Sequence, residues 1–289
     1  MQHVSEVAGA LFAVMTMLVS LPAPAGGRLL ATGGAMPVEG AAGGGIVPWA
    51  VLSGYSTPED TGPTIAYTRL ASADFELDVL GFSWNLWNRV ELSAARQTFD
   101  IGALTPALGS DPGDLQQDVL GLKLRLYGDV VYTAWPQIAV GAQYKRNRDF
   151  LVPSAVLARD DDDTDFYVAA TKLVLAGAFG RNVALNGTIR YTRANQLGLV
   201  GFGGDLNSDR QLMAELSAAV FLNRKLAIGA EYRQKPDNLS FAEEDDWSDV
   251  FFAWFPNKHV ALVGAWARLG SIATFADQDG FYLSAQASY

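Results

Sequence analysis

The chain has 289 residues, of which 49% are hydrophobic, a formal net charge of −10 at pH 7 and no cysteine. Without cysteine it has neither a disulfide framework nor the lipid-modified cysteine of a lipoprotein. The acidic balance makes a nucleic-acid partner unexpected, and most of it is explained by solubility. The longest uncharged apolar run, residues 7–21, is too short and too early for a membrane-spanning helix.

Residues 1–25 are predicted to form a secretory signal peptide that is cleaved before Gly26. The apolar run 7–21 is followed by "PAPAGG", which contains a small-residue cleavage pattern of the A-x-A type. The first six residues, "MQHVSE", depart from the usual pattern because they contain no Lys or Arg. The alternative is an N-terminal anchor helix.

Beyond Gly26 the hydrophobic pattern has a period of two residues, which is typical of β-strands. In "DVLGLKLRLYG", for example, leucines alternate with glycine, lysine and arginine. Segments of this kind follow one another along the chain. The predicted strands span 46–56, 62–71, 74–87, 89–99, 118–128, 137–147, 165–178, 182–195, 209–222, 225–235, 246–256, 258–269 and 279–289.

The connections between these strands alternate in length. One set is short and carries Asn beside a basic residue, as tight turns favour; these turns lie in 86–92, 179–185, 221–228 and 255–262. The other set is long and mostly acidic, and it spans 100–115, 147–164, 195–208 and 236–246. This alternation predicts an all-β fold, an up-and-down antiparallel barrel in the outer membrane with short periplasmic turns. A soluble β-sandwich is the alternative.

The strand count depends on the Gly-rich start of the barrel domain, residues 26–289. Bacterial barrels of this kind have an even number of strands. If 28–37 forms a first strand, the barrel has about 14 strands, which we favour. If 26–60 is partly non-spanning, it has about 12. The Gly-rich segment 26–45 is therefore either a first strand or a plug in the lumen, and "EGAAGGG" (39–45) suits a constriction or plug.

Side-chain alternation assigns an apolar outer face and a polar inner face. Leu120, Leu122, Leu124 and Leu126 share one face of their strand, whereas Lys123 lies on the other. Aromatic residues are expected in two girdles at the membrane interfaces. Toward the long loops these are Tyr144, Tyr191 and Tyr232, and toward the short turns they are Trp84, Trp87, Trp135, Phe179, Phe221, Trp254 and Tyr289.

Ten charged side chains are expected to face the lumen. A basic wall contains Lys123, Arg125, Lys145, Lys172 and Arg190, while Glu215, Glu231 and Asp249 form an acidic wall that includes Arg233, and Glu91 comes from an earlier strand. In a water-filled lumen these groups stay solvated and line a pore. The alternative is a salt-bridge network that seals a narrow barrel. About 14 strands leave room for water.

Few residues suit catalysis or metal binding. His259 is the one histidine outside the predicted signal peptide, and it lies in a predicted periplasmic turn, on the wrong side for a catalytic pair at the outer mouth. The run "RDDDDTD" contains the acidic stretch Asp160–Asp163, which a hard divalent cation could bind, but a solvated loop is the simpler interpretation. We therefore expect no enzyme, no cofactor and no metal.

Several stretches resemble one known family. They are "GGRLLATGG", "EGAAGGGIVPWAVLSGY", "LQQDVLGLKLRLYGDVVY" and "PQIAVGAQYKRN". Together they are similar to an uncharacterised proteobacterial group, a domain of unknown function regarded as outer-membrane-like, and the similarity covers nearly all of residues 26–289. It implies an exported protein of Gram-negative bacteria and supplies no functional residues.

The sequence thus predicts an outer-membrane β-barrel that contacts membrane lipid and lipopolysaccharide. Its C-terminal strand, ending at Tyr289, resembles the signal that the barrel-assembly machinery recognises. The favoured function is a porin-like passive channel for small hydrophilic solutes with a charged lumen. The alternative is a plugged barrel with a structural or partner-binding role and no transport. The sequence indicates no oligomeric state.

Overall fold

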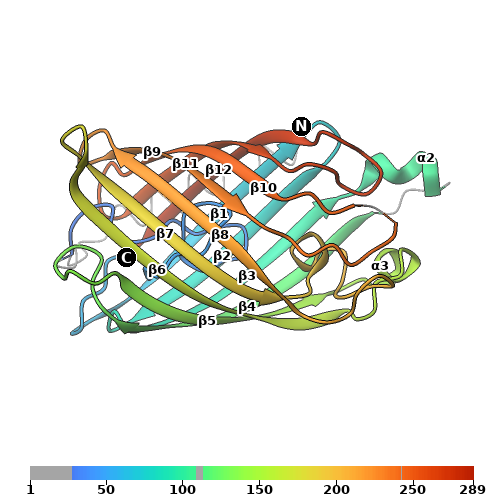
Figure 1. Cartoon of the computed structure of the whole chain (residues 1–289), viewed down its shortest axis with the longest axis horizontal. Coiled ribbons are helices and arrows are strands. Elements are labelled where there is room, and N and C mark those ends of the chain that lie inside the picture. The colour runs from blue at the N-terminus through green and yellow to red at the C-terminus, as the bar shows by residue number, and fades with distance from the viewer. Residues whose placement is uncertain (1–27, 109–112, 242) are drawn as a thin grey trace.

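The computed structural model describes residues 28–108, 113–241 and 243–289, and the predicted signal peptide lies outside this part. Twelve antiparallel strands form a closed barrel in which each strand pairs with its neighbours in sequence (Figure 1). The strands are β1 (Thr61–Ser72), β2 (Glu76–Leu86), β3 (Val90–Asp100), β4 (Asp114–Tyr127), β5 (Gln137–Asn147), β6 (Asp162–Ala178), β7 (Arg181–Thr192), β8 (Gln211–Phe221), β9 (Leu226–Arg233), β10 (Trp247–Trp254), β11 (Val260–Arg268) and β12 (Asp279–Ser288).

The last strand closes the barrel against the first. β1 and β12 are paired from Thr64↔Ser288 to Ser72↔Gly280. Beyond this register, the Tyr289 N–H donates to the Pro63 carbonyl at 3.0 Å. The chain therefore ends inside a continuous ladder, which leaves no open sheet edge.

The connections confirm the alternation in outline. Tight turns join β2–β3, β6–β7, β8–β9 and β10–β11, while most connections at the other end are longer. These longer loops hold the short helices η1 (Gly102–Leu104), α2 (Thr105–Leu108), α3 (Leu151–Ala155) and η2 (Asn195–Gly198). Two connections depart from the pattern. Residues 128–136 form a long connection at the end with the tight turns, and residues 73–75 form a short connection at the end with the long loops. In the part described, no helix is long and apolar enough to cross a membrane.

The outer face is apolar along the strands. On β4, for example, Leu120 and Leu122 are 56% and 42% exposed, whereas Lys123 between Leu122 and Leu124 is 1% exposed. Tyr144, Tyr191 and Tyr232 form the expected belt near the long loops. At the turn end, exposed aromatic side chains form a second belt of Trp84, Trp87, Trp135, Phe179, Trp254 and Tyr289. Phe221, predicted for this belt, instead belongs to the inward-facing series of β8.

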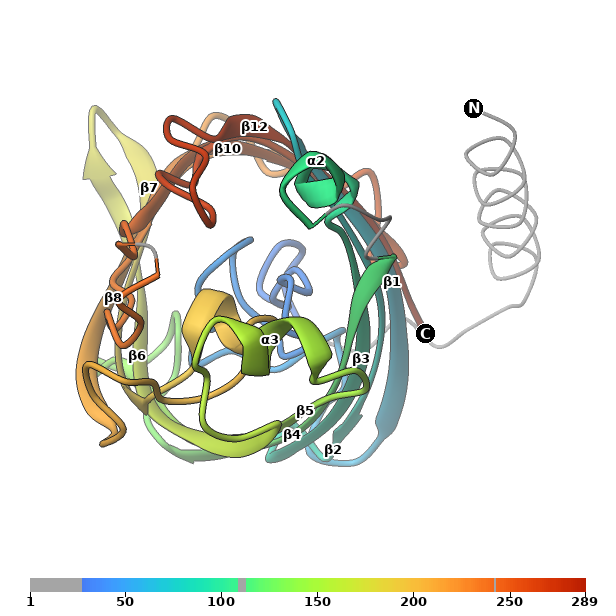
Figure 2. The same cartoon turned by 90° about the vertical axis from the view of Figure 1, so that its right-hand side faces the viewer.

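The preferred count of 14 strands is wrong, and the alternative of 12 is confirmed. Neither 28–37 nor 46–56 forms a barrel strand. Both belong to residues 28–56, here called the plug, which makes only isolated bridges such as Gly34↔Ser53 and Ala35↔Gly43. Apart from Trp49, residues 33–56 are buried, and the plug folds inside the ring of strands (Figure 2). The weak alternation of 46–56 is explained by this position, because a coiled segment inside the lumen has no two-sided sheet to match.

Candidate functional site: a plugged lumen

Two wall carboxylates hold the plug by its backbone amides. Glu91 on β3 accepts hydrogen bonds from the N–H groups of Ala42 at 2.9 Å and Ser53 at 2.7 Å. On the opposite wall, Glu231 on β9 accepts from the N–H groups of Gly45 and Ile46 at 2.7 and 2.8 Å. Hydrogen bonds to an ionised acceptor are stronger than neutral ones. These contacts fix two points of a segment that has no regular secondary structure.

Other wall side chains bind the plug carbonyls. Lys123 Nζ donates to the carbonyls of Ala42 at 2.6 Å and Val51 at 3.0 Å, and it lies 3.4 Å from Glu91. Gln137 Nε2 and Thr188 Oγ1 donate to other plug carbonyls at 2.6 and 2.7 Å. Buried backbone groups need such partners, and here the barrel wall supplies what strands would otherwise provide.

Glu39 is the acidic residue by which the plug joins a buried ion cluster. It accepts from Lys145, from Arg190 Nη2 at 3.1 Å and from Arg233 Nη1 at 2.6 Å. The basic side chains come from β5, β7 and β9, so one plug carboxylate links three strands. Each of these four side chains is at most 3% exposed.

Two wall carboxylates complete this cluster. Asp165 on β6 lies 2.7 Å from Lys145 Nζ and 3.3 Å from Arg190 Nη1. Glu215 on β8 lies 2.6 Å from Arg190 Nε. A buried charge without a partner carries a large desolvation cost. The basic side of the wall is therefore neutralised by the plug and by its own neighbours, and it does not face open water.

The glycines of the plug permit this close packing. A Cβ at Gly44 would collide with the Glu231 carboxylate, and a Cβ at Gly43 would collide with the Val47 carbonyl. Gly40 has a φ of +81°, and a Cβ there would lie 2.8 Å from that of Ala95. The run "EGAAGGG" thus lets backbone approach the wall without side chains between them.

A second segment covers the lumen at the long-loop end. η2 lies across the mouth (Figure 2), and all four of its residues are buried. The Leu197 carbonyl accepts from Lys145 Nζ at 3.0 Å, and the Gly198 carbonyl accepts from Asn147 Nδ2 at 2.6 Å. Lys145 therefore contacts both the plug and this cover.

Glu244 and Lys235 fix the cover from the β9–β10 side. The Gln196 N–H donates to Glu244 Oε1 at 2.9 Å, and Lys235 Nζ lies 2.9 Å from Glu244 Oε2. Burial raises the pKa of Glu244 above its usual value, although Lys235 and the Gln196 N–H act against that shift.

Nine of the ten side chains expected at the lumen are on its side of the sheet. Six of them, Lys123, Lys145, Arg190, Arg233, Glu91 and Glu231, contact the plug, and Glu215 contacts Arg190 and Arg233. Arg125 lies at the turn end, 3.1 Å from Asp129. Asp249 is paired with Glu231 in the register, and its carboxylate accepts no hydrogen bond from the described residues. Whether any of these residues lines a conducting pore stays a prediction.

The predicted inward position of Lys172 is wrong. Thr171 and Leu173 take the buried, inward positions of β6, so Lys172 points outward. Its ammonium group turns to the carbonyl groups of Val131 and Thr133 in the β4–β5 loop. A long, flexible side chain can reach polar groups away from its own backbone in this way.

The acidic stretch Asp160–Asp163 is only partly a solvated loop. Arg193 lies 2.7 Å from Asp160 and 2.5 Å from Asp163, and Arg210 also pairs with Asp163. Asp162 begins β6 and accepts from the Tyr144 hydroxyl at 2.5 Å. Within the described ranges, no group of three or more His, Cys, Asp or Glu side chains is placed to hold a metal ion.

The predicted location of His259 agrees with the structure. It lies in the turn between β10 and β11, where its backbone N–H donates to Asn257 Oδ1 at 2.8 Å. Its ring atom Nδ1 is 3.0 Å from the Ser288 carbonyl, at the turn end of the barrel.

Comparison with solved structures finds similar barrels at low sequence identity. The KdgM porin is 12% identical over 78% of this chain and 99% of the porin, with a TM-score of 0.48. The Acinetobacter baumannii outer membrane protein Omp33 is 8% identical over 78% of this chain and 97% of that protein, with a TM-score of 0.47. An outer membrane channel from Pseudomonas putida F1 is 15% identical over 79% and 94%, with a TM-score of 0.45. These likenesses concern the fold alone.

Comparison with curated protein sequences gives no match. A family profile, in contrast, matches residues 32–286 and so includes both the plug and the barrel. The predicted relationship to an outer-membrane-like family of unknown function is thereby confirmed. The chain belongs to the family described as "Protein of unknown function (DUF3034)".

Proposed function

We propose that the protein is an outer-membrane channel that its own plug holds closed. Support for the membrane comes from the outer face, where large apolar or aromatic side chains are exposed on every strand from β2 to β12. A water-soluble protein rarely exposes an apolar surface of this extent. A closed barrel also satisfies every backbone group that hydrocarbon would leave unpaired.

The ion pairs of Glu39 with three basic side chains of the wall, here called the clamp, are the main observation in support of a closed channel. Lys145 and Arg190 are buried to 1% exposure or less, and both are bonded to the plug. In an open lumen these side chains would be hydrated. A passive, permanently open pore therefore fits this arrangement less well than a channel that opens when the plug moves.

The lining of the wall supports a path for small hydrophilic solutes. At mid-height the inward side chains are charged or amide-bearing, and examples are Lys123, Gln143, Arg190 and Glu231. Most of their hydrogen bonds to the plug go to backbone N–H and C=O groups, which water or a polar solute can replace. Withdrawal of the plug would leave the lumen polar at mid-height, with charges of both signs.

Planar-bilayer recording of the purified protein tests this proposal. The full-length barrel is expected to be silent or to open rarely, whereas a deletion of residues 28–56 is expected to conduct steadily. Heat-modifiable migration on a gel confirms that both proteins are folded barrels, and outer-membrane fractionation tests the location.

The possible outcomes separate the competing functions. Steady conductance of the full-length protein would favour the passive porin. A folded deletion variant that stays silent would favour a barrel with a structural or partner-binding role and would end the channel proposal.

A further inference from the structure

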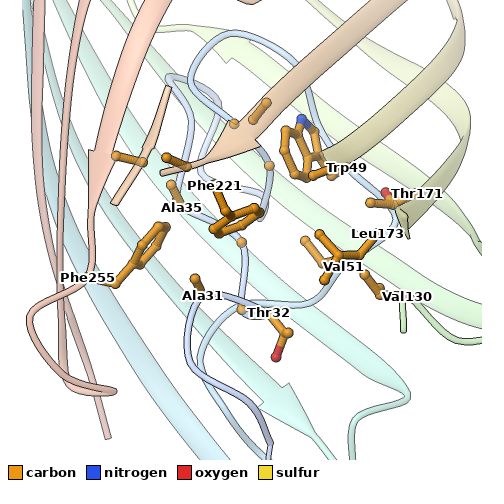
Figure 3. A pocket seen from close by; sticks show the side chains of 18 of the residues that line it. Ala31, Thr32, Ala35, Trp49, Val51, Val130, Thr171, Leu173, Phe221 and Phe255 are labelled. Atoms are coloured by element: carbon orange, nitrogen blue, oxygen red, sulfur yellow. The ribbon is translucent and has the colours of Figure 1, made fainter. Parts of the chain in front are cut away.

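An apolar pocket lies between the plug and the wall at the turn end of the barrel. The pocket opens to solvent, and the volume of about 590 Å³ between its lining atoms is partly this open space. The wall side is lined by inward-facing residues of β6 to β10 and the residue after β10, among them Leu173, Phe221 and Phe255 (Figure 3). Trp49 and Val51 line it from the plug.

This wall differs from the interior expected of an outer-membrane barrel, which is polar. Farther from the turns, the same strands carry inward-facing Arg190 and Glu215, but at the pocket they carry Ala184 and Ala219. On the plug side, the residues from Ala31 to Ala35 are small and leave the space unfilled. The polar groups of Trp49 and Thr171 are already bonded to Glu231 and to Asn186. The pocket therefore offers contact to hydrocarbon and little to a polar solute.

The rim of the pocket is positively charged. Arg28 Nη2 donates to the carbonyl of Thr32, a lining residue, at 2.7 Å. In the part of the chain that the structure describes, no carboxylate lies within 4.0 Å of Arg28. Arg125 is close enough that burial and its charge together lower the pKa of Arg28 to about 10. Asp129, next to the lining residue Val130, pairs with Arg125 at 3.1 Å. Two guanidinium groups thus share one nearby carboxylate.

We propose that this pocket binds a single-chain amphiphile with an anionic head, such as a fatty acid, which enters from the turn end of the barrel. The hydrocarbon chain lies against Leu173, Phe221 and Phe255, and the carboxylate reaches the guanidinium groups of Arg28 and Arg125. A chain buried there gains roughly 0.8 kcal/mol for each methylene removed from water. The site lies in the same lumen as the proposed solute path, but binding there does not require the barrel to conduct.

Quenching of Trp49 by 12-bromododecanoic acid tests this assignment, because bromine quenches indole fluorescence on contact. The full-length protein is placed in phosphatidylcholine nanodiscs, and the Trp49→Phe variant is subtracted to remove quenching of the tryptophans at the lipid surface. A saturable Trp49 component is expected. Its absence would overturn the proposal.

Matched variants locate the ligand. Ala219→Phe fills the pocket and is expected to abolish the saturable component, whereas Ala218→Phe, which points to lipid on the same strand, is expected to leave it unchanged. Equal quenching in these two variants would overturn the assignment to the pocket.

The head group is tested with 12-bromododecanol, which has no charge. We expect the acid to bind roughly tenfold more tightly than the alcohol, since a charge-assisted hydrogen bond supplies the difference. Arg28→Gln should remove this preference. Equal binding of the two probes would overturn the anionic head, and quenching of Trp49 by brominated phosphatidylcholine alone would overturn the single chain.

Discussion

Two regions of the lumen wall face the plug in contrasting ways. At mid-height Glu91, Lys123 and Glu231 bond directly to plug backbone groups, and Glu39 is clamped by three basic side chains. At the turn end, Leu173, Phe221 and Phe255 face the plug across a pocket. The polar contacts at mid-height fix the position of the plug. The apolar wall at the turn end leaves space beside the plug. Substitutions in the two regions should therefore have different consequences.

The largest effect is expected from Glu39→Ala. Removing one partner of a buried ionic cluster costs about 3–5 kcal/mol, since the remaining charges stay buried without compensation. The variant should unfold at lower urea concentration and should show openings in bilayer recordings. The control is Glu59→Ala, at an exposed position after the plug. Equal stability of the two variants would contradict the clamp.

Glu91→Gln is expected to have the next largest effect. The amide keeps the shape of the carboxylate but removes the charge that balances Lys123 and that accepts from Ala42 and Ser53. A loss of about 2 kcal/mol is expected for hydrogen bonds to a charged group. Amide hydrogen exchange at Ala42 and Ser53 should accelerate relative to that of Ala50, which bonds to Thr171. Unchanged protection would show that the charge is dispensable.

A pair of small-to-larger substitutions compares the two regions directly. Gly44→Ala places a methyl group against the Glu231 carboxylate, and we expect it to destabilise the barrel by about 1–3 kcal/mol through overpacking. Ala219→Val adds carbon to the pocket, where it should change the stability by less than about 1 kcal/mol. Urea unfolding of both variants measures the difference. The comparison fails if Ala219→Val is the more damaging change.

The smallest effect concerns pH at the cover of the long-loop end. Because burial raises the pKa of Glu244 above its usual value, the folded loop binds a proton more tightly than the unfolded loop. This contribution to the stability of the folded loop is therefore fully present below the usual pKa and is lost as the pH rises through the raised pKa. The Gln196 N–H should be more protected from hydrogen exchange at acidic pH than at neutral pH, after correction for intrinsic exchange rates. Glu244→Gln should remove this pH dependence.

The strands of the barrel were accessible from sequence because their physical signal is local. Period-two alternation and Asn-containing turns mark each strand by its own residues, and the prediction for 137–147 coincides with β5 (Gln137–Asn147). The last strand, predicted at 279–289 and observed as β12 (Asp279–Ser288), followed from the same pattern. These features depend on neighbours in the chain and need no tertiary contact.

The plug contacts and two side-chain orientations were not accessible in the same way. Glu39 gains its role from Lys145, Arg190 and Arg233, which are brought together only by closure of the barrel. Around Lys172, the sequence "AATKLVLAG" is apolar on both faces, so alternation gave no reliable register. Phe221 carries the same ambiguity at the end of its strand, where an aromatic residue suits either the lipid belt or the lumen.

The measurement that tests the central claim most directly is thiol labelling inside the lumen. The chain has no cysteine, so Thr188→Cys provides a single reporter at a wall position that is 2% exposed and bonded to the plug. A charged, membrane-impermeant methanethiosulfonate reagent should leave this cysteine unlabelled in the full-length barrel and should label it rapidly when residues 28–56 are deleted. A cysteine at the exposed position Ser154 should react in both proteins. Rapid labelling of Thr188→Cys in the full-length barrel would contradict a lumen closed by its plug.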